Sequence, residues 1–146
     1  MKTAYLDNAA TTRLHPEVRA AMDPAFEAFG NPSSIHAAGR AARKIVEDAR
    51  ERIAASLGAD PREIVFTSCA TEANNLALFS RGDRVVTSAV EHPSVLEASP
   101  RAIRLRVDST GRVDPATLPD SATLISIMAA NNEVGTIQPV AEIANR

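Results

Sequence analysis

The sequence has little of several residue types, and each shortage narrows the classes of protein to which it can belong. Its 146 residues include one cysteine, Cys69, no tryptophan and only 3% aromatic residues. A single cysteine excludes an internal disulfide and a thiol-rich metal site. The three histidines are too scattered to form a metal cluster, so we expect no metal. No apolar run approaches the roughly 20 residues that cross a bilayer, so we expect no membrane association.

A strong charge of one sign is also lacking. The formal net charge is −2, so no general attraction to nucleic acid is expected. The N-terminus has no apolar signal-peptide core, which predicts a cytoplasmic protein. The chain is 45% hydrophobic and 23% charged, which is ordinary for a soluble globular protein. Its length is sufficient to form a hydrophobic core.

Helix and strand patterns alternate along most of the chain. Apolar residues at helical spacing predict a helix over 16–29, bent or ended by Pro24, and a longer helix over 37–57. Shorter helical segments are expected over 71–79, from Pro93, over 114–118 and from Pro139. Four apolar runs between them predict strands over 63–67, 84–88, 103–107 and 122–128. This alternation predicts an α/β fold with a largely parallel sheet.

Two of these strands have compositions that indicate their place in the sheet. Arg104 and Arg106 alternate with apolar residues in 103–107, which predicts a strand near an edge. The run 122–128 is almost wholly apolar, so we expect it to be central.

A small polar turn, residues 67–71, separates the strand 63–67 from the next helix. The backbone N–H groups of Ala70 and Thr71 lie at the predicted helix start, with the hydroxyls of Ser68 and Thr71 beside them. Free N–H groups and the helix dipole favour an anion there, and a phosphate fits best. The alternative is an ordinary helix start with Thr67 or Ser68 as the N-cap. The turn by itself does not decide between the two.

Polar segments follow three of the four predicted strands, at 67–71, 88–92 and 131–135. In open α/β sheets, ligands bind at the carboxyl ends of the strands. We therefore expect these three segments to meet at one site.

Five segments in the same order carry a family resemblance. They are 5–12 (YLDNAATT), 30–34 (GNPSS), 66–75 (FTSCATEANN), 91–92 (EH) and 131–138 (NNEVGTIQ). Together they resemble the N-terminal portion of the cysteine desulfurases, pyridoxal-phosphate enzymes related to class V aminotransferases. The resemblance covers essentially the whole chain.

The resemblance implies a role for several residues. Ala70 and Thr71 would bind the phosphate of pyridoxal 5'-phosphate. His92 would lie over the pyridine ring and move protons, and Asn132 would hydrogen-bond the phenolic oxygen of the ring. Asn8 would approach the substrate side. Taken alone, His92 reads more readily as a surface histidine, Asn132 as a turn residue, and Asn74 and Asn75 as part of a solvated helix face.

The resemblance also implies the fold, which is the large domain of the pyridoxal-phosphate transferase fold type I, truncated before its last strands. Residues 1–14 would line the active site, and 15–146 would form the first part of the cofactor-binding domain. The family sheet has seven strands. It would place 63–67 apart from the other three strands, with a gap between them.

Cys69 departs from the family pattern, which usually has glycine at this position. A side chain there crowds the phosphate turn and strains the backbone if the position requires a positive φ. The sulfur-accepting cysteine of the family lies much later in the sequence. We therefore interpret Cys69 as a substitution and not as the nucleophile.

Three family residues are expected after Arg146: the lysine that holds the cofactor as a Schiff base, the aspartate at the pyridinium nitrogen, and the arginine for the substrate carboxylate. The chain has only two lysines, Lys2 and Lys44, and neither is in a suitable place. Residues 1–146 alone are therefore expected to be inactive and to bind the cofactor weakly or not at all.

The parent enzyme is expected to convert L-cysteine to L-alanine and enzyme-bound sulfur, for iron–sulfur cluster assembly or other sulfur transfer. The expected partners are L-cysteine, a sulfur-acceptor protein and a second copy of the enzyme in a homodimer. The alternatives are a selenocysteine lyase, another class V aminotransferase-like enzyme, or a non-catalytic remnant that serves as an interaction domain.

Overall fold

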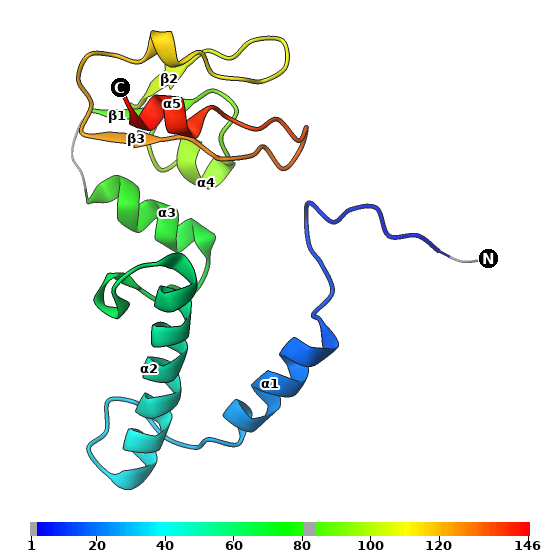
Figure 1. Ribbon diagram of the computed structural model, residues 1–146, viewed down its shortest axis with the longest axis vertical. Helices are drawn as coiled ribbons and strands as arrows, with labels where there is room; N and C mark the ends of the chain where they lie inside the picture. The colour runs from blue at the N-terminus through cyan, green and yellow to red at the C-terminus, as the bar shows by residue number, and fades with distance from the viewer. Residues whose placement is uncertain (1–2, 81–83) are drawn as a thin grey trace. The chain divides into compact units, whose positions relative to one another are not determined.

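The computed structural model describes residues 3–80 and 84–146 (Figure 1). They belong to two compact units, Met1–Phe66 and Thr67–Arg146. In the described part of the first unit all regular structure is helical, whereas the second unit contains a β-sheet. No helix among the described residues is both long enough and apolar enough to cross a membrane.

The first unit contains α1 (Pro16–Phe26), α2 (Ala37–Leu57) and the short 3-10 helix η1 (Pro61–Glu63). Helix α1 begins with proline in its first turn, where the missing N–H costs nothing. It contains Pro24 and ends three residues before the predicted end at 29. Its side chains are exposed within this unit.

Helix α2 has the predicted bounds, and both of its ends are capped. At the start, the imidazole of His36 accepts a hydrogen bond from the backbone N–H of Gly39 at 3.3 Å. At the end, Gly58 adopts the left-handed conformation with φ 66°, and its N–H donates to the carbonyls of Ala54 and Ala55. Glycine is favoured at this position because it has no Cβ to clash.

The predicted strand over 63–67 is wrong. Glu63 ends η1, and the residues that follow it are in no strand of the sheet. Instead, the side chain of Arg50 donates to the carbonyl of Ile64, and its guanidinium lies 4.8 Å from the ring centroid of Phe66. A strand requires ladder hydrogen bonds to a neighbour, and no described segment supplies them here. The gap expected beside this segment stays a prediction.

The second unit has the α/β order that the sequence predicts (Figure 1). Its elements are α3 (Ala70–Phe79), β1 (Val85–Ser88), α4 (Pro93–Leu96), β2 (Ile103–Leu105), η2 (Pro115–Thr117), β3 (Leu124–Ser126) and α5 (Val140–Ala144). Strands β2 and β3 are shorter than the apolar runs that predicted them.

The three strands are parallel and lie in the order β2-β1-β3. Val86 of the middle strand pairs with Ile103 on one side and with Ile125 on the other. The prediction of an edge position for β2 is confirmed. The prediction of a central position for β3 is wrong for the described residues, because β3 pairs only with β1 and Ile125 is 39% exposed. An apolar composition predicts burial of the faces and not a neighbour on both edges.

Helices cover both faces of this sheet. Because successive side chains of a strand point to opposite faces, Val85 and Val86 contribute to different clusters. One cluster contains Val86, Leu105, Val113 and Ile143, and the other contains Leu78, Val85 and Val95. Helix α5 therefore packs on one face, and α3 and α4 pack on the other. The carboxyl ends of the strands carry the polar loops.

Candidate functional site

Helix α3 begins with backbone N–H groups that have no partner. Cys69 is the N-cap residue, and its side chain makes no capping hydrogen bond. Neither Thr67 nor Ser68 is the N-cap, so the alternative of an ordinary capped start is not what the structure shows. Among the described residues, the N–H groups of Ala70 and Thr71 donate no hydrogen bond. Two free donors at the positive end of the helix dipole can bind a phosphate.

The turn before α3 is held by its own side chains. The carboxylate of Glu72 accepts hydrogen bonds from the backbone N–H of Ser68 at 2.6 Å and from the Ser68 hydroxyl at 2.7 Å. These two hydrogen bonds lower the pKa of Glu72. The Thr67 hydroxyl donates to the carbonyl of Cys69 at 3.1 Å. The Ser68 hydroxyl is therefore engaged by Glu72, whereas the backbone N–H groups of Ala70 and Thr71 donate to no described residue.

Cys69 is exposed at this turn, and its backbone is not strained. Its φ is −166°, an extended conformation that any residue adopts. The positive-φ strain considered from the sequence is therefore absent, and the crowding of a phosphate by this side chain stays a prediction. The pKa of its thiol is lowered, first by the backbone N–H of Glu72 and then by the Ser68 hydroxyl and the N–H of Thr71; these N–H groups lie near Sγ, although none of them makes a capping hydrogen bond to it. Helix N-termini favour the thiolate in this way.

His92 lies at the N-cap of α4, four residues after the end of β1. Its Nδ1 accepts a hydrogen bond from the backbone N–H of Ser94 at 3.1 Å and lies 2.8 Å from the Ser94 hydroxyl oxygen. The same hydroxyl oxygen accepts a hydrogen bond from the side-chain amide of Asn74 at 2.9 Å. Asn74 lies one helical turn after Ala70 and Thr71, so this chain of hydrogen bonds connects the start of α3 to His92.

The loops after β1 and β3 are joined by two buried polar side chains. Glu91, only 8% exposed, accepts hydrogen bonds from the Ser88 hydroxyl at 2.8 Å and from the backbone N–H of Met128 at 2.9 Å. The buried amide of Asn131 donates to the carbonyl of Val90 at 3.1 Å. Residues 88–92 and the loop from 131 therefore lie together, and α3 contacts the segment after His92 through Asn74. That residues 67–71 join the same site stays a prediction.

Asn131 also shapes the loop that carries Asn132. Its side-chain oxygen accepts the N–H groups of Glu133 and Val134, and Gly135 closes the turn with φ 75°. Asn132 itself is exposed, and its side-chain amide lies 3.3 Å from the carboxylate of Glu133. An exposed amide can hydrogen-bond a ligand, which is compatible with the role that the resemblance implies.

Asn8 belongs to the other compact unit, where it lies in an exposed turn. Its part in the site stays a prediction, as do the bounds 1–14 and 15–146. Lys44 lies on the exposed face of α2 and forms an ion pair with Asp48 at 2.7 Å, as a surface lysine does. Lys2 lies outside the described residues. Within the described chain, no three histidine, cysteine or acidic side chains are grouped to hold a metal ion.

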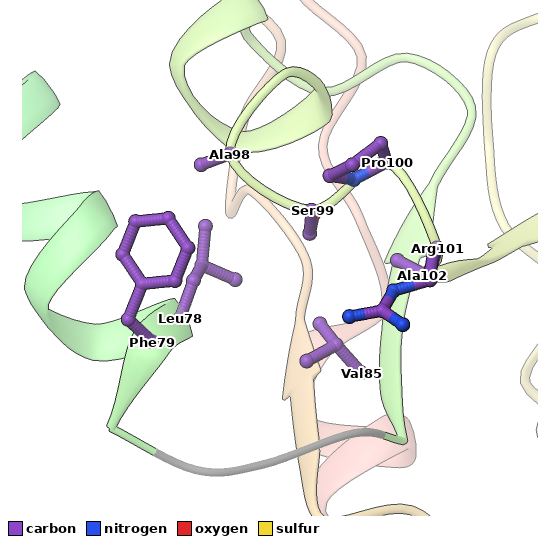
Figure 2. A pocket seen from close by; sticks show the side chains of 8 residues that line it. All are labelled: Leu78, Phe79, Val85, Ala98, Ser99, Pro100, Arg101 and Ala102. Atoms are coloured by element: carbon purple, nitrogen blue, oxygen red, sulfur yellow. The ribbon is translucent and has the colours of Figure 1, made fainter.

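A pocket of about 290 Å³ lies elsewhere in the second unit (Figure 2). Its lining includes Leu78 and Phe79 at the end of α3, Val85 at the start of β1, and residues 98–102 before β2. Its polar side chains are Ser99, whose hydroxyl donates to the carbonyl of Val95, and Arg101. It lies at the amino ends of the strands, opposite the edge that carries His92, so it is not the site that the polar segments form.

Three residues of this site were not found by sequence reasoning: Glu91, Asn74 and Ser94. The motif at 91–92 drew attention to the histidine, and the asparagines of α3 read as a solvated helix face. Asn74 is instead half-buried because its amide contacts Ser94, twenty residues later. No local sequence pattern predicts a contact between residues twenty positions apart. A signal was available only for Glu91, as an acidic residue immediately after an apolar strand.

Comparisons with known proteins agree with the geometry. A family model described as Aminotransferase class-V matches residues 4–146. A protein of Dictyoglomus turgidum named cysteine desulfurase IscS is 46% identical, over 98% of this chain and 41% of that protein. A protein of Bacillus subtilis named putative cysteine desulfurase IscS 1 is 42% identical, over 98% of this chain and 43% of that protein.

Solved structures show the same likeness. A structure described as a NifS-like protein matches with a TM-score of 0.83 and 39% identity, covering 94% of this chain and 43% of that one. The structure of DndA from Streptomyces lividans matches with a TM-score of 0.78 and 39% identity, covering 97% of this chain and 45% of that one. The chain thus spans about two fifths of the length of the proteins that it matches.

Proposed function

Because the chain belongs to the class-V aminotransferase family, we propose that the protein that carries it is a pyridoxal 5'-phosphate-dependent cysteine desulfurase. In this reaction L-cysteine gives L-alanine, and its sulfur bonds to an enzyme thiol to form a persulfide. The C–S bond of the substrate breaks, an S–S bond forms on the enzyme, and the proton of the enzyme thiol ends on the β-carbon of alanine. The observation that carries the proposal is the contact of α3 with the segment after His92, and of the His92 segment with the loop of Asn132, in a chain 46% identical to a cysteine desulfurase.

The residues present fit the cofactor. The free N–H groups of Ala70 and Thr71 bind its phosphate, helped by the positive end of the α3 dipole. The exposed amide of Asn132 binds the phenolic oxygen. When bound, pyridoxal phosphate supplies an electron sink for the breaking of bonds in the substrate.

His92 serves two purposes in this proposal. Its exposed imidazole would lie over the ring of the bound cofactor, and its Nε2 would hold or move a proton, because Nδ1 is engaged by Ser94. Residues 1–14 line the substrate side of the site through Asn8, and residues 15–146 form the first part of the cofactor-binding domain. L-cysteine is the substrate.

The proposal extends to the surroundings of the enzyme. We propose a cytoplasmic homodimer that delivers sulfur to an acceptor protein, including for iron–sulfur cluster assembly. The support is the naming of the similar proteins as cysteine desulfurases.

The test is a reaction with L-cysteine, using the protein expressed from its complete gene and supplied with pyridoxal phosphate and a thiol reductant. We expect alanine and sulfide in equal amounts, and a visible absorption band from the bound cofactor. Pyruvate in place of alanine, or turnover of L-selenocysteine alone, would contradict the proposal. Absence of both cofactor band and turnover would indicate a non-catalytic protein that keeps the fold.

A further inference from the structure

Only one of the two ring nitrogens of His92, Nδ1, is hydrogen-bonded to a described residue. Nδ1 contacts the backbone N–H and the hydroxyl of Ser94, whereas Nε2 makes no hydrogen bond to a described residue. Both Ser94 and Asn74 are half-buried, and the His92 ring is exposed. The two nitrogens of the ring therefore have different surroundings.

These contacts decide which nitrogen of the neutral ring carries the proton. A backbone N–H can only donate, so Nδ1 must accept and must be unprotonated. The Asn74 amide donates to the Ser94 oxygen at 2.9 Å, which leaves the hydroxyl hydrogen free to point at Nδ1. Both donors of Ser94 then act on the same nitrogen. The proton of the neutral imidazole is consequently on Nε2.

The same contacts tie the ring to the start of α3. Asn74 follows Ala70 and Thr71 by one turn of the helix, and α3 packs against α4 through Leu78 and Val95. A single chain of hydrogen bonds, from Asn74 to Ser94 to His92, therefore sets the His92 ring relative to the two free N–H groups.

We propose that Ser94 and Asn74 are positioning residues that hold His92 as its Nε2–H tautomer, so that Nε2 is the atom that donates a proton in the reaction. The part concerning the reaction rests on the proposed cysteine desulfurase activity. The part concerning the tautomer does not, because it follows from contacts within the chain.

The tautomer can be measured directly by long-range ¹H–¹⁵N correlation spectra of the complete protein labelled with ¹⁵N-histidine. The His92 signals are assigned by their loss in His92→Asn. We expect the pattern of an unprotonated Nδ1 and a protonated Nε2. In Ser94→Ala the Nδ1–H tautomer should gain about two- to tenfold in population, the value of one ordinary hydrogen bond. Asn74→Ala should shift it in the same direction and by less.

Matched variants separate positioning from a general loss of structure. Ser94→Thr keeps the hydroxyl and should keep the wild-type pattern. Ser80→Ala removes a hydroxyl whose only hydrogen bond to a described residue is to the carbonyl of Ala77, and should leave the His92 signals unchanged. Circular dichroism of each variant reports whether it folds.

Turnover of L-cysteine is the second readout. Ser94→Ala should lower kcat by about the same two- to tenfold with little change in KM, and Ser94→Thr should restore it. A wild-type Nδ1–H tautomer, or identical tautomer populations in wild type, Ser94→Ala and Asn74→Ala, would overturn the inference. If the tautomer shifts as expected in a protein that does not act on L-cysteine, the proposed function fails and the positioning of His92 stands.

Discussion

Glu91 accepts a hydrogen bond from the backbone N–H of Met128 at 2.9 Å, and this bond joins the loop after β1 to the end of β3. The two residues are 37 positions apart in the sequence, so the contact depends on the fold and not on local structure. It places a carboxylate that is almost fully buried directly before His92.

Glu91→Ala should destabilise the protein by about 1–3 kcal/mol, because the buried Ser88 hydroxyl and the N–H of Met128 lose their acceptor. Glu91→Gln keeps one acceptor oxygen and should lose less. Urea unfolding of both variants measures the difference in free energy of unfolding. The exposed Glu51→Ala is the control, with an expected change within about 0.5 kcal/mol. Equal stabilities of Glu91→Ala and Glu51→Ala would show that the contact does not stabilise the fold.

His92→Asn should lower turnover of L-cysteine by about 10²–10⁴-fold, because the imidazole that moves protons is lost. Asparagine is a favoured N-cap residue, so this variant keeps the start of α4 and should fold normally. His92→Ala should lose turnover equally and, in addition, about 1 kcal/mol of stability, since the cap is removed. Steady-state kinetics and thermal unfolding separate the two effects. Near-normal turnover in His92→Asn would show that the imidazole has no catalytic part.

If the proposed function holds, Cys69→Ser and Cys69→Gly should both keep the release of alanine from L-cysteine, because we interpret Cys69 as a substitution and not as the sulfur acceptor. The backbone at Cys69 is extended and unstrained, so glycine relieves no strain. Removal of the side chain in Cys69→Gly leaves more room for the phosphate, so cofactor affinity should be equal or higher. Alanine quantification and titration with pyridoxal phosphate measure the two quantities. A complete loss of alanine release with cofactor still bound would make Cys69 catalytic.

The hydrogen bonds from Ser68 to Glu72 should persist to a pH below the usual range of a glutamate carboxyl. The folded pKa of Glu72 is lowered by the N–H and hydroxyl of Ser68. A lowered pKa means that this stabilisation is fully present above the carboxyl pKa of the unfolded chain, and is lost as the pH falls through the folded pKa. Protection of the Ser68 amide from hydrogen exchange, followed from neutral to acidic pH, reports it. In Glu72→Gln the pH-dependent step should be absent, and the same step in that variant would refute the assignment.

Much of the second unit could be predicted from the sequence because its signals are local. The start of α3 near Ala70 follows from small polar residues before a helical pattern, and β1 follows from an apolar run. The segment 63–67 has an equally strong apolar pattern and is not a strand, since pairing depends on a neighbour that its own residues do not specify. Strand β3 was placed centrally for the same reason: composition reports burial and not pairing.

The candidate site could be predicted only where function leaves a motif. His92, Ala70 and Thr71 lie in such motifs, and the Asn74–Ser94 hydrogen bond links the helix that begins at Ala70 to the segment after His92. The residues that hold the site in shape were not predicted, because Asn74–Ser94, Glu91–Met128 and Asn131–Val90 are contacts across 20 to 41 positions. Asparagine, serine and glutamate are common in loops and on helix faces, so their presence in the sequence does not indicate the partner that each contacts in the folded chain.

The parallel pairing of β1 with β3 has a consequence for the order in which the nascent chain can fold. Strand β1 is wholly buried in the finished sheet, yet both of its partners, β2 and β3, are synthesised after it. While the ribosome is still adding residues up to Met128, β1 has apolar side chains and an incomplete ladder, and closing the intervening loops has an entropic cost. The first unit can form its local helices during that interval. The sheet of the second unit cannot form until β3 has been synthesised. The chain is therefore most prone to aggregate with other nascent chains during the synthesis of the residues between β1 and β3.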